Sequence, residues 1–417
     1  MRIYEKILYF VNMDSIKEIF KIGLGPSSSH TIGPQHAAEK FAEKNPDAVS
    51  FRVSLYGSLG ATGKGHNTDK AIVRGMAPKE VEIVWRPDIV QEFHTNGMYF
   101  EALDGSGKVL SDWTVYSIGG GNLAEGPKTG DVKDEPYPRN LLSEIQEIIE
   151  SEGLSFWEYV EYHEGKDIWP YLSKVWEQMQ QSIREGLEND GRLPGCLRLK
   201  SKAKQYYIRA SSLKDNLRSR AQVCAYALAV SEQNARGGTV VTAPTCGSCG
   251  VVPAVLYHLK VSHGFGDSDI LKALATAGLF GNVIRTNASI SGAEVGCQGE
   301  IGSACVMAAA AANQLFGGTP QQIEYAAEMA MEHNLGLTCD PICGLVQIPC
   351  IERNPIAALR ALDVSLYAVL GDGRHLISFD KVIDTMKRTG KDLPSLYKET
   401  AEGGLATLYY EKSRFKE

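Results

Sequence analysis

Three cysteines in the last third of the chain have the surroundings needed to hold a metal or an iron–sulfur cluster. Cys297, Cys339 and Cys350 each lie in a segment with Gly, Ser or Pro residues that should interrupt a helix. Such segments can bring three thiolates to one centre and leave one coordination position open. That arrangement suits a cluster or metal that acts as a Lewis acid on a substrate. A single cysteine is more often a small buried hydrophobe, but three in polar loops favour ligation.

A second group of polar residues lies directly before a predicted helix near the N-terminus. It comprises the hydroxyls of Ser27, Ser28, Ser29 and Thr31, with His30 among them. An N-cap needs only one hydroxyl, so this segment has more than capping requires. The positive end of a helix also attracts carboxylates. The segment therefore predicts either a substrate-binding site or an elaborate cap.

Two glycine-rich segments follow. The first resembles a P-loop but does not match it, because five residues separate Gly57 from Gly63 and Gly65 stands where Ser or Thr must bind Mg²⁺. A nucleotide site is therefore not expected. The segment either presents His66 to a site or forms a tight strand-to-helix turn with a surface histidine. The run 119–121 predicts a turn.

Two further polar segments lie in the second half. Cys246 and Cys249 form a Cys-x-x-Cys motif, which can bind zinc or do redox chemistry, but no second pair stands at zinc-finger spacing. A substrate-contacting loop is the alternative. The run that contains Asn287, Ser289 and Ser291 should be buried beside Ala-rich helices only if its groups have partners, which a substrate or a cluster would supply.

The remaining cysteines carry less information. Cys224 and Cys305 lie in apolar helical segments and are expected in the core. The sequence leaves the roles of Cys196 and Cys343 open.

The bulk composition limits the classes of function. The chain has 417 residues, a formal charge of −7 and 43% hydrophobic residues, which is ordinary for a soluble protein and argues against nucleic acid as a partner. The N-terminus lacks a secretory signal, and the longest apolar run, 304–312, is too short to cross a bilayer. We expect a cytoplasmic protein that does not enter a membrane, with reduced cysteines and no disulfides.

Two patterns of hydrophobic residues predict an α+β protein with two domains. Residues 1–137 are expected to form an α/β domain and residues 138–417 a mostly helical domain, with the Pro/Gly-rich stretch 126–138 as linker. The first domain should have strands at 51–56, 81–85 and 113–118 and helices at 32–41 and 68–74. The Ala-rich second domain should be a tight bundle with helices at 141–150, 169–188, 216–234, 269–280, 304–316, 320–333 and 379–389.

Five segments, in order along nearly the whole chain, resemble the bacterial iron–sulfur L-serine dehydratases (L-serine ammonia-lyases) in their single-chain form. They are Gly-Pro-Ser-Ser-Ser-His-Thr (25–31), Thr-Gly-Lys-Gly-His-Asn-Thr-Asp (62–69), Asn-Ala-Ser-Ile-Ser-Gly-Ala-Glu-Val-Gly-Cys-Gln-Gly-Glu (287–300), Glu-His-Asn-Leu-Gly-Leu-Thr-Cys-Asp-Pro (332–341) and Gln-Ile-Pro-Cys-Ile-Glu-Arg-Asn (347–354).

The resemblance implies a [4Fe–4S] cluster held by Cys297, Cys339 and Cys350. It also implies that the first domain, similar to a regulatory substrate-binding domain of phosphoglycerate dehydrogenases, lends His30 and His66 to the active site as acid–base groups. The substrate would be L-serine, the products pyruvate and ammonia, and the role amino-acid catabolism that feeds gluconeogenesis. Homodimers are usual in this family.

The chain departs from the family at two places. Many members have Asn where this chain has Cys246, and many end with a cysteine that reaches back to cap the fourth iron. This chain has no cysteine there, and Glu411 falls near that position. We expect water, Glu411 or no tail group at that iron.

Other functions fit part of the pattern. A cluster-dependent hydro-lyase acting on a hydroxy acid is the closest alternative. A cluster sensor or electron carrier would need four protein ligands and no Ser-Ser-Ser-His segment. A plain amino-acid-binding protein would leave the three cysteines unexplained.

Overall fold

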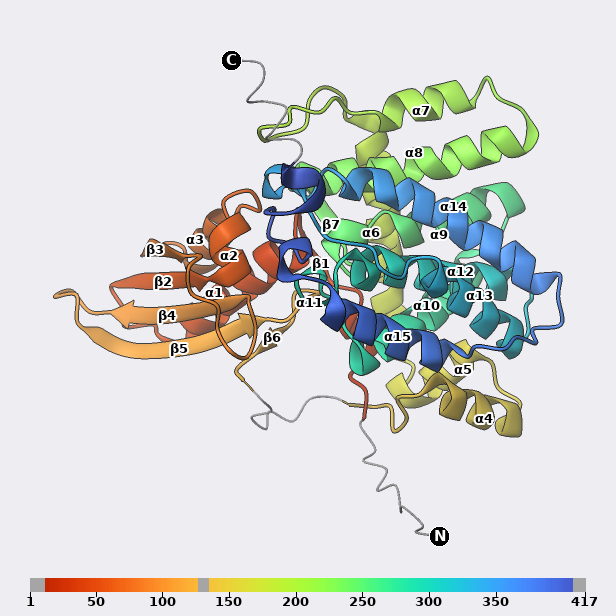
Figure 1. The fold of residues 1–417 in the computed structure, drawn as a ribbon, viewed down its shortest axis with the longest axis horizontal. Helices are drawn as coiled ribbons and strands as arrows, with labels where there is room; N and C mark the ends of the chain where they lie inside the picture. Colours follow the sequence, from red (N-terminus) through yellow and green to blue (C-terminus); the bar gives the residue numbers. More distant parts are fainter. Residues whose placement is uncertain (1–11, 127–134, 408–417) are drawn as a thin grey trace, which may run out of the picture.

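The computed structural model describes residues 12–126 and 135–407 and has a small sheet region beside a larger helical region (Figure 1). The sheet has five strands in the order β3-β2-β4-β5-β6. β2 and β3 are parallel, and the other neighbours are antiparallel. The strands are β2 (Ser50–Tyr56), β3 (Glu80–Arg86), β4 (Gly97–Leu103), β5 (Val109–Ser117) and β6 (Leu123–Ala124). The predicted fold class is confirmed.

Alternation along β2 explains how the sheet region forms its core. Phe51, Val53 and Leu55 are buried, while the residues between them are half-buried, because successive side chains of a strand point to opposite faces. These buried side chains meet three helices that cover one face of the sheet (Figure 1): α1 (Gly33–Lys44), α2 (Gly57–Thr62) and α3 (Thr68–Met76). The three predicted strands and two predicted helices are present. α2, β4 and β6 were not predicted.

The helical region supplies the larger core. Its helices are α4 (Leu142–Glu152), α5 (Phe156–Glu164), α6 (Ile168–Glu188), α7 (Ala203–Ala210), α8 (Asp215–Ala235), α9 (Val251–His263), α10 (Asp267–Asn287), α11 (Gly292–Val295), α12 (Ser303–Leu315), α13 (Pro320–Glu332), α14 (Cys350–Val369) and α15 (Phe379–Asp392). All seven segments predicted to be helical are present. α5, α7, α9, α11 and α14 were not predicted.

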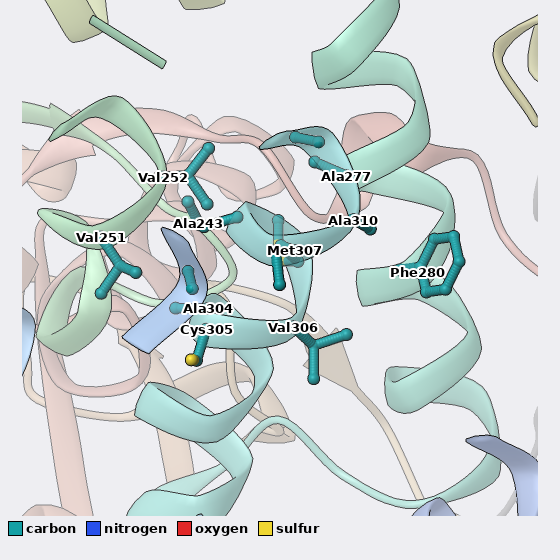
Figure 2. Close-up of a cluster of buried hydrophobic side chains, with 14 of the residues drawn as sticks. Ala243, Val251, Val252, Ala277, Phe280, Ala304, Cys305, Val306, Met307 and Ala310 are labelled. Atoms are coloured by element: carbon teal, nitrogen blue, oxygen red, sulfur yellow. The ribbon is translucent and has the colours of Figure 1, made fainter. Parts of the chain in front are cut away.

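α12 runs through the centre of this region. Every residue from Ser303 to Asn313 is buried, and Figure 2 shows α12 side chains beside Val251 and Val252 of α9 and Phe280 of α10. Alanine has a small side chain and loses no rotamer entropy on burial, so the Ala-rich sequence of α12 lets neighbouring helices approach closely.

One expectation about the cysteine segments is wrong. Cys350 does not lie in an interrupted segment; it is the first residue of α14, directly after Pro349. Residues 346–349 form a bend and a turn, and the first amides of a helix need no intrahelical partner, so a helix can begin here. Cys297 and Cys339 do lie outside regular α-helices.

The N-terminal part of the chain joins the two regions. Met13, Ile16 and Phe20 pack in the core of the helical region, and β1 (Ile22–Leu24) pairs with β7 (Thr239–Val241). The chain then enters the sheet region at Ser27. The domain boundary at 137/138 stays a prediction. Among the described residues, no helix combines the length and apolar character needed to cross a bilayer.

Candidate active site

A small cavity of about 10 Å³ lies where the two regions meet. The sheet region contributes Ser27 and His66 to its wall. The helical region and the C-terminal segment contribute Gly247, Glu300, Cys339, Pro341, Val346, Cys350 and Glu399.

Two of the three predicted cysteines, Cys339 and Cys350, line this cavity, and Cys297 lies beside Cys339. Cys297 precedes the π-helical turn Gln298–Gly302, Cys339 follows α13, and Cys350 begins α14. Within the described chain, ligand atoms of Cys297, Glu300 and Cys339 lie within 4.8 Å of one another. Both of these sulfurs are 3.9 Å from Glu300 Oε2. Cys350 lines the same cavity, although its sulfur is outside that group.

The thiols differ in their surroundings. A hydrogen bond from Cys339 lowers the pKa of Cys297, and the same contact raises the pKa of Cys339. Burial raises the pKa of Cys350. The guanidinium of Arg353 brings a positive charge that lowers the pKa of Cys297, and its Nη1 donates to Thr338 O at 2.6 Å. A cation beside clustered sulfurs favours their thiolate forms.

Glu300 is a site residue that was not singled out from the sequence. Thr245 Oγ1 donates to Glu300 Oε1 at 2.7 Å, and burial raises the pKa of this carboxyl group. Gly247 lies beside it, because a Cβ at Gly247 would be 3.2 Å from Glu300 Oε1. The Cys-x-x-Cys segment therefore faces the site with Thr245 and Gly247. Cys246 is buried, and burial raises its pKa, so a reactive thiolate is not favoured there.

His30 is held by hydroxyl groups on both ring nitrogens. Its Nδ1 is 2.8 Å from Ser29 Oγ, and its Nε2 is 3.1 Å from Ser58 Oγ. Glu399 Oε1 is 3.7 Å from Nδ1. Burial lowers the pKa of His30 well below its usual value, so the ring is neutral near pH 7.

His66 lies in the turn between α2 and α3, next to His30. It is fully buried, and neither ring nitrogen has a hydrogen-bond partner among the described residues. Burial lowers its pKa to about 4. Thr31 Oγ1 positions the turn by donating to the His66 carbonyl at 2.8 Å. A buried polar group without a partner is costly, so this imidazole is poised to bind a ligand.

The hydroxyl segment 27–31 serves mainly to position these groups. Ser27 Oγ accepts from the His30 amide at 3.1 Å and also lines the cavity. Ser28 is buried at the start of the π-helical turn Ser28–Ile32 that leads into α1. The segment therefore caps a turn, and its Ser27 also lines the cavity.

Glu399 is a second residue that sequence reasoning missed. The C-terminal segment pairs with the cysteine loop, because Cys339 N donates to Tyr397 O and Glu399 N donates to Cys339 O, both at 2.7 Å. Ser58 Oγ donates to Glu399 O at 3.1 Å. Burial raises the pKa of Glu399 well above its usual value. Nothing in the local sequence distinguishes this glutamate, whereas Glu411 lies outside the described residues.

Six of the seven predicted substrate contacts are not among the residues that line the cysteine cavity: Ser28, Ser29, Thr31, Asn287, Ser289 and Ser291. Asn287 Nδ2 donates to Asn140 O at 2.6 Å, which ties α10 to the segment before α4. Ser289 donates to Glu294 and accepts from the amide of Ser291. Ser291 also packs against the turn at Gly119, where a Cβ would be 3.1 Å from the Ser291 Cβ.

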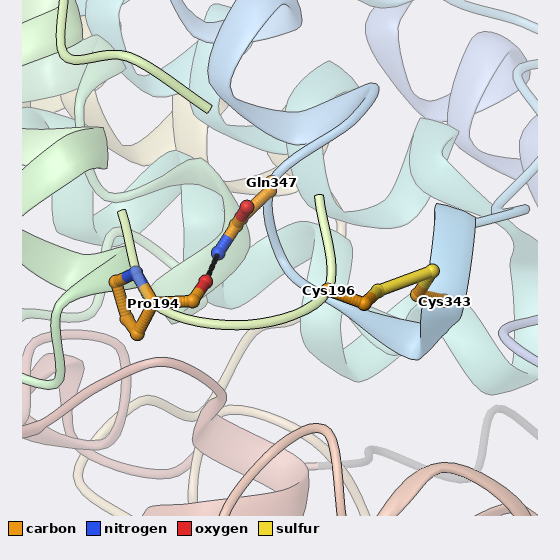
Figure 3. Close-up of a disulfide and its surroundings, with 4 residues drawn as sticks. All are labelled: Pro194, Cys196, Cys343 and Gln347. Carbon is orange, nitrogen blue, oxygen red and sulfur yellow. Dashed lines mark hydrogen bonds between the residues drawn. A yellow bond between two sulfur atoms is a disulfide. The ribbon is translucent and has the colours of Figure 1, made fainter. Parts of the chain in front are cut away.

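One expectation about the other cysteines is wrong. The structure joins Cys196 and Cys343 in a disulfide, with their Cα atoms 7.0 Å apart (Figure 3). This Cα separation is slightly longer than the usual range for disulfides, which ends at about 6.8 Å. The general rule that intracellular thiols stay reduced cannot show which pairs the fold brings together. Cys305 is fully buried in the core, as expected, whereas Cys224 is only half-buried.

The fold and the site together define a two-region enzyme with a cysteine-rich site suited to a metal cofactor. Comparison with protein families gives the particular family: residues 15–84 match the model of the serine dehydratase beta chain, and residues 74–406 match that of the serine dehydratase alpha chain. The chain belongs to the serine dehydratase family.

Full-length relatives agree with this assignment. The chain is 41% identical to an L-serine dehydratase of Streptomyces coelicolor, 40% identical to L-serine dehydratase 2 of Escherichia coli and 36% identical to an L-serine dehydratase of Helicobacter pylori. Each comparison covers 94% of this chain and 98% of the relative.

Proposed function

We propose that this protein is an L-serine ammonia-lyase, which converts L-serine to pyruvate and ammonia with a [4Fe–4S] cluster held by Cys297, Cys339 and Cys350. The observation that carries the proposal is a buried cavity lined by Cys339 and Cys350, with Cys297 beside Cys339, and by the neutral imidazole of His66, which has no hydrogen-bond partner among the described residues. The names of the relatives supply the substrate.

The donor atoms fit such a cluster in kind. Thiolate sulfur is the usual protein ligand of iron–sulfur clusters, and three thiols leave one iron without a protein sulfur. When bound, the cluster supplies a Lewis acid that assists departure of the serine hydroxyl group.

The unpaired nitrogens of His66 make it the best candidate for the base that removes the α-proton. A base must be neutral and free to accept, and burial keeps this ring unprotonated down to a pH of about 4. Both nitrogens of His30 already have hydroxyl partners, so His30 is better placed to orient Ser29 and Ser58. Ser27 and the amides that follow it offer donors for the substrate carboxylate. Once the proton and hydroxyl have left, the aminoacrylate becomes an imine and hydrolyses.

Anaerobic reconstitution with iron and sulfide, followed by a pyruvate assay with L-serine, tests the proposal. We expect turnover that depends on iron and declines after exposure to air. Turnover of serine by iron-free protein would refute it. Activity on malate or a citrate analogue instead of serine would favour a hydro-lyase acting on hydroxy acids.

A homodimer is part of the same proposal. Tyr367, Leu370 and Leu376 are 62%, 79% and 88% exposed near the C-terminal end of α14, where a second copy would cover them. Sedimentation equilibrium tests this, and a monomer at micromolar concentration would contradict it. The cytoplasmic location stays a prediction.

A further inference from the structure

The Cys196–Cys343 disulfide joins two loops that are far apart in the sequence. Cys196 lies in the loop between α6 and α7, and Cys343 lies in the 3-10 turn Ile342–Gly344. The second loop connects Cys339 to Cys350, two of the proposed cluster ligands. Gln347 Nε2 donates to Pro194 O at 2.7 Å and forms a second link between the same loops (Figure 3). The disulfide thus restrains the segment that carries two of the proposed cluster ligands.

The backbone of this segment is held in an unusual conformation. Cys343 has a φ of 57°, in the left-handed region that residues with a side chain rarely adopt. Such a residue keeps this conformation only when its surroundings hold it. The turn that carries His66 packs against this segment, because a Cβ at Gly65 would be 2.9 Å from Gly344 O. Movement of residues 343–344 would therefore displace the turn that carries His66.

The two loops also form the walls of a larger cavity of about 440 Å³. Its lining includes Pro194 and Cys196 of the first loop, Cys343 and Val346 of the second, and Lys64. Val346 also lines the cysteine cavity. The larger cavity therefore adjoins the site, and the disulfide lies in its wall.

Cys196 is the cysteine that a reagent in solution reaches most easily. It is exposed, and Cys343 is half-buried. The seven other cysteines are free, and six of them are buried while Cys224 is half-buried. Thiol–disulfide exchange needs access to a sulfur, so it should occur first at this pair.

We propose that Cys196–Cys343 is a redox modification site that controls how firmly residues 339–350 are held at the entrance to the active site. A small dithiol reduces the protein disulfide to two thiols and becomes a cyclic disulfide. In the reverse direction, a low-molecular-weight disulfide takes two electrons and two protons from the thiols, forming the protein S–S bond and releasing two small thiols. The oxidised form holds the loops together. The reduced form keeps the Gln347 hydrogen bond and the packing of Gly195 against Leu345 but no covalent link, so Cys343 relaxes and the cavity wall opens.

Peptide mapping and hydrogen exchange test this in the full-length protein as purified under argon. Blocking of free thiols and digestion without reductant should yield a peptide in which Cys196 is linked to Cys343 after treatment with oxidised glutathione. Dithiothreitol should remove that link. Amide exchange of peptides covering 339–350 should then accelerate roughly tenfold, as expected for a local opening that has lost a covalent tie. Exchange in α12 should not change.

Three serine variants separate this effect from general thiol chemistry. Cys196→Ser, on an exposed loop, should exchange at the rate of the reduced protein under both conditions, and Cys343→Ser should do the same. Cys224→Ser, the matched control, should keep the redox response. Equal exchange in oxidised and reduced wild type, or failure of Cys196 and Cys343 to pair in the presence of the small disulfide, would overturn the proposal. These readouts do not require catalysis, so they stand apart from the proposed reaction.

Discussion

The imidazole rings of His30 and His66 lie with their centroids 4.5 Å apart in a space from which water is excluded. The two rings have different partners: hydroxyl groups occupy both nitrogens of His30, whereas those of His66 have no hydrogen-bond partner in the described chain. Burial lowers the pKa of both rings. The pair therefore consists of an oriented ring and a neutral ring that is free to accept a proton.

Replacement of His66 by Asn should remove the base. We expect kcat for serine to fall by about 10²–10⁴, the usual contribution of a positioned acid–base group, with a smaller change in KM. Steady-state pyruvate formation measures both constants, and the exposed His263→Asn is the control. A kcat near that of wild type would show that another group takes the α-proton.

The pH dependence of the same reaction follows from the low pKa of His66. Only the neutral ring accepts a proton, so protonation costs activity below the folded-state pKa. Because that pKa is about 4, kcat/KM should not decline as the pH falls through the usual imidazole value of about 6.5. The decline should begin nearer pH 4. A wild-type profile with an inflection near 6.5 would show that the base is not a histidine whose pKa burial has lowered, and would contradict the assignment to His66.

Gly65→Ala should disturb catalysis without unfolding the protein. The added Cβ would lie 2.9 Å from Gly344 O, a backbone atom that cannot rotate away, so the turn of His66 has to shift. A displaced catalytic group can cost up to about 10²-fold in rate, and we expect a loss of roughly tenfold or more in kcat/KM. Gly105→Ala is the matched control, because no atom lies within 4 Å of its Cβ position. Equal losses in the two variants would argue against contact between the turn and the cysteine loop.

Replacement of a proposed ligand should remove the cofactor before it affects the fold. Cys297→Ser and Cys350→Ser should bind less iron and sulfide after anaerobic reconstitution. Their activity should fall by more than the roughly 10–100-fold that loss of an outer-shell partner costs. Iron and sulfide analysis, with circular dichroism for the fold, provides the measurement, and Cys224→Ser serves as control. Full iron content in Cys350→Ser would leave Glu300, which lies within 4.8 Å of the other two sulfurs, as the third ligand.

Glu328 on α13 should make the stability depend on pH. Burial, and then the nearby charge of Glu332, raises its pKa to about 8. The folded state thus holds this proton at pH values where the unfolded state has lost it, so the contribution of Glu328 to stability falls as the pH rises from about 4.5 to about 8. Glu328→Gln removes this loss and should be more stable than wild type at about pH 9, but not at about pH 5. Urea unfolding at both pH values measures it, with the exposed Glu177→Gln as control. A difference in stability between Glu328→Gln and wild type that does not change with pH would contradict a raised pKa of Glu328.

Several features of the fold and site could be predicted because they depend on neighbouring residues. Alternation in residues 51–56 is enough to predict β2, and an apolar period is enough for helices such as α6 and α12. Helix α9 was missed because its start is glycine- and proline-rich and its residues are buried almost without interruption, and α14 because it begins directly after Pro349 and contains Pro355. The three cysteines and His66 stand out locally by type and spacing.

The sequence by itself determined which residue types are available: thiols in glycine- and proline-bearing segments, and a histidine after a glycine-rich turn. Only the tertiary structure decided which of them meet. Glu300, Glu399 and the pair Cys196–Cys343 carry no local signal, because their partners lie tens to hundreds of residues away in the sequence. Hydrogen bonds and hydrophobic contacts depend on distances in space, and packing of the helical region against the sheet region sets those distances. The same packing removes water from His66 and so decides its charge.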